Sequence, residues 1–220
     1  MARKLARPQR QDTALGFLAM TAGATDALSF LGLGGVFSSV MTANVVLLGL
    51  SAGQRDGALA LRAAVALAGY VLGALAASAL TRPGAAARPA PARLTAALAA
   101  EGIVLAAVTV GWELTGGASA GAAQVALLAG AAAAMGVQGA AVRALGVPDI
   151  STTYMTGMLT GILADLATGT RAGLGRRLGL LGMLVLGALA SGITFAQAPR
   201  LTPLIPLAAL SGAIALTLRR

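Results

Sequence analysis

The sequence predicts an all-α membrane protein with six transmembrane helices and two re-entrant or broken half-helices, arranged as two inverted repeats. Of the 220 residues, 57% are hydrophobic and 10% are charged, which is too little charge to cover the surface of a soluble domain. Apolar runs of roughly 18–25 residues recur along the chain, and this is the length that crosses a bilayer core. Because these runs are continuous and rich in Ala, Leu and Gly, they favour helices over the alternating strands of a β-barrel.

Six apolar runs are the predicted transmembrane helices. They cover residues 13–32, 58–80, 94–114, 119–143, 174–195 and 202–218. The basic residues 1–12 are typical of the charged start of a signal peptide. However, the apolar run that follows contains Asp26, and further spans come after it, which favours an uncleaved first helix behind a cytoplasmic tail. We therefore expect residues 1–220 to form a single transmembrane domain.

Two similar segments lie between these runs. Residues 34–50 read GGVFSSVMTANVVLLGL, and residues 146–163 read GVPDISTTYMTGMLTGIL. Both begin with glycine, continue through a cluster of hydroxyl side chains and a Met-Thr-small triplet, and then become apolar. Each segment is either a full crossing, which gives eight spans, or a re-entrant half-helix, which gives six.

The distribution of Lys and Arg favours six crossings with both termini in the cytoplasm. In that topology Arg55, Arg62 and Arg200 lie outside, and the other thirteen of the 16 basic residues lie inside, as basic loops usually do. Eight crossings would leave eleven inside. We expect the 51–57 segment outside and the 82–93 loop inside, and we attribute the net charge of +9 to topology rather than to a nucleic-acid partner.

The six-crossing topology makes the two halves inverted repeats, at about residues 13–114 and 119–218. The first half-helix enters from the outer face and the second from the cytoplasmic face, a plan shared by many transporters and channels. Chance similarity between Ala- and Gly-rich sequences is the alternative. The matching stretches are residues 41–43 (Met-Thr-Ala) with 155–157 (Met-Thr-Gly), 38–39 (Ser-Ser) with 152–153 (Thr-Thr), and 23–26 (Gly-Ala-Thr-Asp) with 136–139 (Gly-Val-Gln-Gly).

These same stretches resemble the YoaK-type family of bacterial membrane proteins, a domain of unknown function. The resemblance covers nearly the whole chain, and it departs from the family at Ala43, where Thr-Gly-Asn is usual. It implies a multi-pass protein of the bacterial inner membrane and supplies no activity. The residues that carry it are Asp26, Gly35, Val36, Phe37, Met41, Thr42, Gly136, Gln138, Thr156 and Gly157.

The polar residues of the two segments form the candidate solute site. Glycines after the first span permit a reversal, and hydroxyl side chains then occur where a new helix begins. Two helix N-termini meeting near the midplane would suit water, a small neutral polar solute or an anion; the alternative is helix breaks whose hydroxyls bond back to the backbone. The expected solute-binding residues are Asp26, Ser38, Ser39, Thr42, Asn44, Gln138, Thr152, Thr153 and Thr156.

Acidic residues inside predicted spans are candidates for function because an ionised carboxylate there is costly unless it is paired or hydrated. Asp26 has two open roles, proton or cation binding in a coupled carrier and capping of the first half-helix near Ser38. Gln138 is its counterpart in the second half. Glu101 is either a second buried acid or a group that reaches the cytoplasmic interface.

These residues predict a permease for a small neutral polar or anionic solute, acting as a channel or a proton-coupled carrier. The alternative is a non-transporting assembly or accessory protein, or an unrecognised intramembrane enzyme. The chain has no Cys or His and lacks recognisable catalytic or phosphate-binding motifs, so we expect no enzymatic activity, metal or cofactor. The expected partners are the lipid bilayer, the solute and, through Gly/Ala-rich helix faces, further copies of the chain. The spacing of the glycines at residues 69, 73, 179, 182 and 187 predicts close helix packing.

Overall fold

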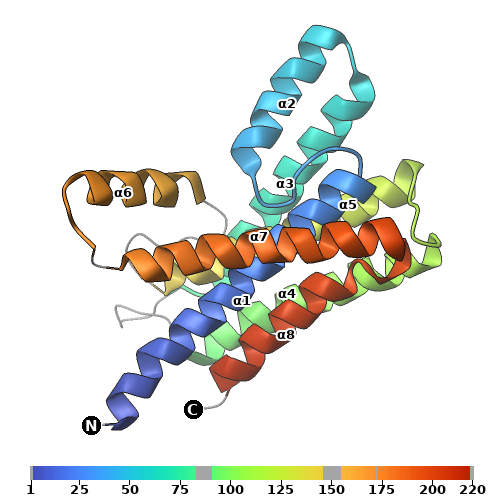
Figure 1. Ribbon diagram of the computed structural model, residues 1–220. Helices are drawn as coiled ribbons and strands as arrows, with labels where there is room; N and C mark the ends of the chain where they lie inside the picture. Colours follow the sequence, from blue (N-terminus) through green and yellow to red (C-terminus); the bar gives the residue numbers. More distant parts are fainter. Residues whose placement is uncertain (1, 83–90, 146–154, 172, 219–220) are drawn as a thin grey trace.

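The computed structural model describes residues 2–82, 91–145, 155–171 and 173–218, and within them it is helical, without strands (Figure 1). Six of the helices are long and apolar enough to cross a membrane, which confirms the predicted all-α class and the six predicted spans. The helices are α1 (Ala2–Gly32), α2 (Met41–Gln54), α3 (Gly57–Leu80), α4 (Pro91–Leu114), α5 (Gly121–Ala144), α6 (Met155–Ala167), α7 (Leu174–Gln197) and α8 (Leu204–Leu218), with a 3₁₀ turn at Pro199–Leu201.

The basic N-terminal segment continues the first helix instead of forming a separate tail. α1 begins at Ala2, and the part of it that is apolar enough to span a membrane begins at Gln9. Residues 2–12 consist largely of Ala, Leu, Arg, Lys and Gln, which are good helix formers. The helical pattern therefore extends beyond the apolar stretch from which the span was predicted.

The central helices of the bundle are α1 and α5, whose spans are the most buried of the six. α1 packs most extensively against α7 and α8, whereas α5 packs most extensively against α3 and α4. The first helix of each half of the sequence therefore lies against the last two long helices of the other half (Figure 1). Neither half has a core that is made from its own helices alone.

Two glycines bring the backbones of α1 and α7 into direct contact. A Cβ atom added at Gly23 of α1 would lie 2.0 Å from the carbonyl oxygen of Leu184, and one added at Gly187 of α7 would lie 2.1 Å from that of Met20. Even an alanine side chain would overlap these oxygen atoms. Small residues of this kind are what allow membrane helices to approach closely.

The same arrangement occurs between α3 and α5. A Cβ atom at Gly73 of α3 would lie 2.0 Å from the carbonyl oxygen of Ala133, and one at Gly136 of α5 would lie 2.1 Å from that of Tyr70. Gly136 is the residue that the sequence comparison aligns with Gly23. The close packing predicted at Gly69 is also confirmed, with its added Cβ 2.7 Å from the carbonyl oxygen of Ala129.

Two glycines of α7 do not pack closely against another helix of the described chain. Gly179 and Gly182 are exposed, and a Cβ atom added at either would meet no atom within 4 Å. Of the three glycines of α7 with this spacing, Gly187 is the one that lies on the face that contacts α1. This difference arises because spacing along a helix does not show which of its faces meets a neighbour.

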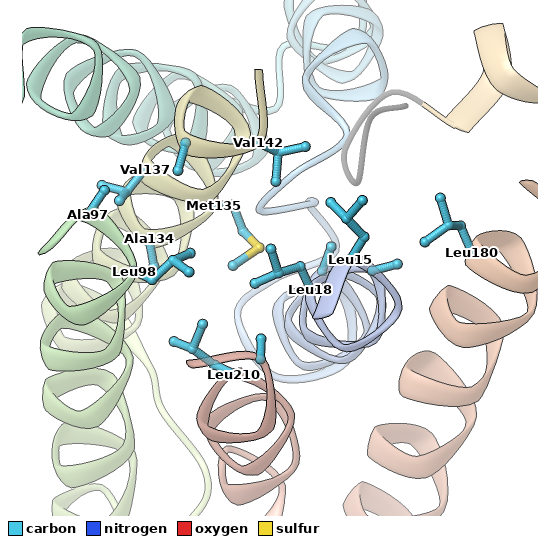
Figure 2. Close-up of a cluster of buried hydrophobic side chains, with 14 of the residues drawn as sticks. Leu15, Leu18, Ala97, Leu98, Ala134, Met135, Val137, Val142, Leu180 and Leu210 are labelled. Atoms are coloured by element: carbon cyan, nitrogen blue, oxygen red, sulfur yellow. The ribbon is translucent and has the colours of Figure 1, made fainter. Parts of the chain in front are cut away.

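Apolar side chains fill the space between the helices in two clusters. The larger cluster is drawn in Figure 2, where side chains from α1, α4, α5, α7 and α8 point toward one another. The second cluster lies beside the end of α1 and includes Trp112, which is fully buried. The Trp112 ring packs against Phe195, and its indole N–H donates to the carbonyl oxygen of Pro199 at 2.9 Å. Trp112 thereby joins the end of α4 to the turn between α7 and α8.

The shorter helices are attached at opposite ends of this bundle. α2 and the first part of α3 form a hairpin that extends away from the centre, and α6 lies to one side beside the first part of α7 (Figure 1). Asp165 of α6 forms an ion pair of 2.6 Å with Arg177, and Asp12 of α1 forms one of 2.6 Å with Arg176. The beginning of α1 and the end of α8 lie at the same end of the molecule, as an even number of crossings requires.

The glycine contacts predict a contrast between two positions on one helix. Gly187→Ala should destabilise the folded protein by about 1–3 kcal/mol, because the new methyl group overlaps the backbone of α1. Gly182→Ala should raise stability by up to about 1 kcal/mol, because alanine favours the helix and the methyl group meets open space. Thermal unfolding of the purified variants in one detergent measures both changes. Equal melting temperatures for the two variants would contradict the packing.

The predicted topology can be measured with single cysteines in this Cys-free chain. A cysteine at Gly53, exposed near the end of α2, should react with a membrane-impermeant maleimide added outside intact cells. One at Thr170, exposed between α6 and α7, should react only after the membrane is permeabilised. Labelling of the Thr170 cysteine in intact cells would exclude the six-crossing arrangement with cytoplasmic termini.

Candidate functional site

The chain reverses sharply after α1, at the glycines where a reversal was predicted. Gly34 and Gly35 have φ angles of +101° and +77°, which are accessible mainly to glycine. The N–H groups of Leu33 and Gly35 donate to the carbonyl oxygens of Ser29 and Phe30 at 3.0 and 3.1 Å. These bonds close the end of α1 and direct the following residues back along the helix.

The carboxylate of Asp26 binds the segment that returns. Its Oδ1 accepts hydrogen bonds from the N–H and hydroxyl of Ser38 at 2.8 and 2.9 Å and from the N–H of Ser39 at 2.7 Å. Its Oδ2 accepts one from the hydroxyl of Ser39 at 2.5 Å. All three residues are buried. Asp26 therefore satisfies two backbone and two side-chain donors at a point where the chain is not helical.

The geometry differs from simple capping of α2 by the serines. We expected Ser38 and Ser39 near the first turn as acceptors, but α2 begins at Met41, and its N-cap residue, Val40, makes no side-chain capping bond. The serines instead act as donors to a carboxylate from another helix. Because Asp26 lies six residues before the end of α1, the start of α2 lies roughly 9 Å back along α1.

Asn44 fixes the same segment from within α2. Its Oδ1 accepts a hydrogen bond from the N–H of Phe37 at 3.0 Å, and its Nδ2 donates to the carbonyl oxygen of Phe37 at 2.6 Å. Asn44 is fully buried, and the Phe37 ring stacks on Phe30 of α1 with centroids 5.2 Å apart. One amide side chain thus satisfies both backbone groups of a residue outside the helix.

Gln138 lies in a different part of the bundle. Its Nε2 donates to the carbonyl oxygen of Leu18 at 3.0 Å and links α5 to α1. Leu18 is eight residues before Asp26, a separation of roughly 12 Å along the helix. The structure therefore places Asp26 and Gln138 at different depths along α1, and among the described site candidates it joins Asp26 by hydrogen bonds to Ser38 and Ser39.

The predicted threonines do not join this cluster in the described part of the chain. Thr42 and Thr156 occupy exposed positions on α2 and α6, because the helical phase that buries Asn44 turns Thr42 away. Thr152 and Thr153 lie outside the described residues. A role for the nine residues in solute binding stays a prediction.

The sequence interpretation missed a groove between α3 and α5. The groove has a volume of about 650 Å³ and is lined mainly by small apolar side chains, with Arg62 and Gln124 as its polar members. The Nε atom of Arg62 is buried and has no hydrogen-bond partner among the described residues. The charge pattern alone predicts that Arg62 lies outside as a topology signal, whereas its position within an apolar span indicates a further role.

The hydrogen bonds of Asp26 predict a large effect on stability. Asp26→Ala leaves the donors of Ser38 and Ser39 unpaired and should cost about 3 kcal/mol of folding free energy. Asp56→Ala is the matched control, because Asp56 accepts one bond, from the N–H of Leu59 at 2.9 Å, at the exposed start of α3. It should cost about 1 kcal/mol. Melting temperatures compare the variants, and equal losses would show that Asp26 is not a special anchor.

The sequence of the chain matches a known protein family and a bacterial membrane protein. A family model described as "Protein of unknown function (DUF1275)" matches residues 14–217. The UPF0700 transmembrane protein YoaK of Bacillus subtilis (strain 168) is 32% identical over 157 residues, which cover 71% of this chain and 68% of that protein. No solved structure matches the chain. This chain is therefore a multi-pass membrane protein that belongs to the YoaK-type DUF1275 family.

Proposed function

We propose that the chain is a permease of the bacterial inner membrane for a small neutral polar or anionic solute, not an enzyme. The observation that carries the proposal is the break between α1 and α2, where a buried carboxylate replaces helical hydrogen bonding. Non-helical backbone at membrane depth is tolerated where it is buried in protein or lines a cavity. Discontinuous helices of this kind form the solute sites of many secondary transporters.

The proposal includes an arrangement of the two halves as inverted repeats, which the matching glycine contacts support. Exchange of the two halves converts the contact of Gly23 with α7 into the contact of Gly136 with α3. The same exchange converts the contact of Gly187 with α1 into that of Gly73 with α5. In this proposal α2 and α6 are equivalent re-entrant helices, and the pair α1–α7 moves relative to the pair α3–α5 around a site between the starts of α2 and α6.

The solute site is proposed to lie at the midplane between the starts of α2 and α6. Ser38, Ser39 and Asn44 offer neutral donors and acceptors that can replace the hydration of a solute. In the described conformation Asp26 and Phe37 occupy these groups. Solute binding therefore requires an exchange of hydrogen bonds, which fits a carrier better than an open channel.

Arg62 favours an anionic over a cationic solute. The side chain of Arg62 lines the groove between α3 and α5. It also lies beside Gly34, at the reversal after α1, since a Cβ atom added to Gly34 would lie 2.3 Å from Cδ of Arg62. A cationic side chain within an apolar span attracts anions and repels cations. In this proposal the solute approaches along the groove and reaches the break after α1 past Arg62, which lies beside both.

A second candidate function is assembly with another membrane helix. It is favoured by the exposed face of α7 at Gly175, Gly179 and Gly182, where an added Cβ meets no atom within 4 Å. Such a face can pack closely against a partner helix.

Flux measurements distinguish the two functions. The purified chain in lipid vesicles should give saturable uptake of at least one member of a panel of small anions and neutral polar solutes. For an anion, Arg62→Gln should lower the flux about tenfold, equivalent to about 1.4 kcal/mol. Arg55→Gln is the matched control, since Arg55 is exposed at the end of α2 and should leave the flux unchanged. Absence of flux with folded protein, together with loss of an oligomer in Gly179→Leu, would favour assembly.

A further inference from the structure

Glu101 is a second buried acid, and the candidate site does not use it. The side chain is fully buried, so the alternative that it reaches the cytoplasmic interface is wrong. Glu101 lies nine residues after Ala92, where the span of α4 begins, or roughly 14 Å into the membrane by helical rise. This depth is close to the middle of a typical bilayer core.

The surroundings of Glu101 on α4 are apolar. Ala97, Leu98 and Leu105, one turn before and one turn after it, belong to the buried cluster, and Figure 2 shows Ala97 and Leu98. The adjacent Gly102 contacts α8, with its added Cβ 3.6 Å from Leu210. Glu101 is thus held in the packed interior between helices and not in a hydrated loop.

Neither carboxyl oxygen of Glu101 has a hydrogen-bond partner among the described residues. The helices packed against α4 are α5, α8 and, less extensively, α3. Their ionisable side chains in the described chain are Arg62 and Tyr70 of α3 and Arg143 of α5. None of these three forms an ion pair with Glu101.

Asp26 and Glu101 therefore represent two different ways of burying an acid. Asp26 accepts four hydrogen bonds, which stabilise its ionised form. Glu101 accepts none from the described part of the chain, and an unpaired ionised carboxylate in an apolar interior is strongly unfavourable. A neutral carboxylic acid in the same position costs much less.

We propose that Glu101 is a proton-binding group in the membrane interior, protonated in the described conformation and able to exchange its proton with water. One carboxyl group without further oxygen ligands is a poor site for a metal cation, whereas acids within membranes commonly carry protons. This inference deepens the proposed function, on which its use rests, because it assigns proton coupling to Glu101 and leaves Asp26 as an anchor.

Infrared difference spectroscopy on the full chain in lipid vesicles tests the proposal without a solute. At neutral pH the wild type should show the carbonyl band of a protonated carboxylic acid, and Glu101→Gln should lose it. Asp26→Asn is the matched control and should retain the band. After transfer to D2O the band should shift, because an exchangeable proton is replaced by deuterium.

Three outcomes would overturn the proposal. Absence of the band would mean that Glu101 is ionised, and its loss in Asp26→Asn would assign the proton to Asp26. A band that never shifts in D2O would mean that Glu101 is a sealed, purely structural acid. If Glu101→Gln does not fold, Glu101→Asp should move the band without abolishing it. Failure of the flux experiment alone would leave these results standing, so the two proposals can fail separately.

Discussion

The binding of Ser38 and Ser39 by the carboxylate of Asp26 is the interaction on which the first half of the structure depends. A membrane interior offers no water to backbone donors that leave a helix. Asp26 supplies acceptors for two such donors and for both serine hydroxyls. The segment just before α2 can therefore lie beside α1, below the end of that helix. The direction of α2, and of α3 that follows it, is set from this point.

The second constraint is the direct contact of helix backbones through glycine. Because α1 lies against α7 and α5 lies against α3 without intervening side chains, each half holds the central helix of the other. Contacts of this kind leave little freedom for sliding, so the pairs α1–α7 and α3–α5 behave as rigid units. α2 and α6 have fewer neighbours than the long helices, which makes them the parts best suited to move.

Much of the fold could be predicted from the sequence because it follows from local patterns. Continuous apolar runs mark the spans, and Gly34 and Gly35 mark the reversal. The pairing of Asp26 with Ser38 was one of two open alternatives, since both residues are polar within an apolar region. The packing of α1 against α7, and of α5 against α3, could not be predicted, because it depends on which faces of these helices meet. It also depends on which faces of the helices meet whether a side chain is exposed, like Thr42 and Gly179, or buried, like Glu101.

The two roles that the sequence leaves open for Asp26, anchoring of the chain and proton binding, belong to two different acids in this account, Asp26 and Glu101. A carboxyl group that accepts many hydrogen bonds is held in one position by its donors, whereas a buried carboxyl group without partners is most easily kept neutral. Anchoring and proton binding make opposite demands on the surroundings of a carboxyl group. Their separation onto α1 and α4 avoids that conflict.

The central claim is that the non-helical segment before α2 is a fixed, buried part of the membrane domain. Amide hydrogen exchange of residues 33–44, measured on the full chain in lipid vesicles, tests it most directly. The account predicts that the amides of Ser38 and Ser39 exchange as slowly as those in the middle of α1. Exchange as fast as that of the exposed residues 168–171 between α6 and α7 would contradict it.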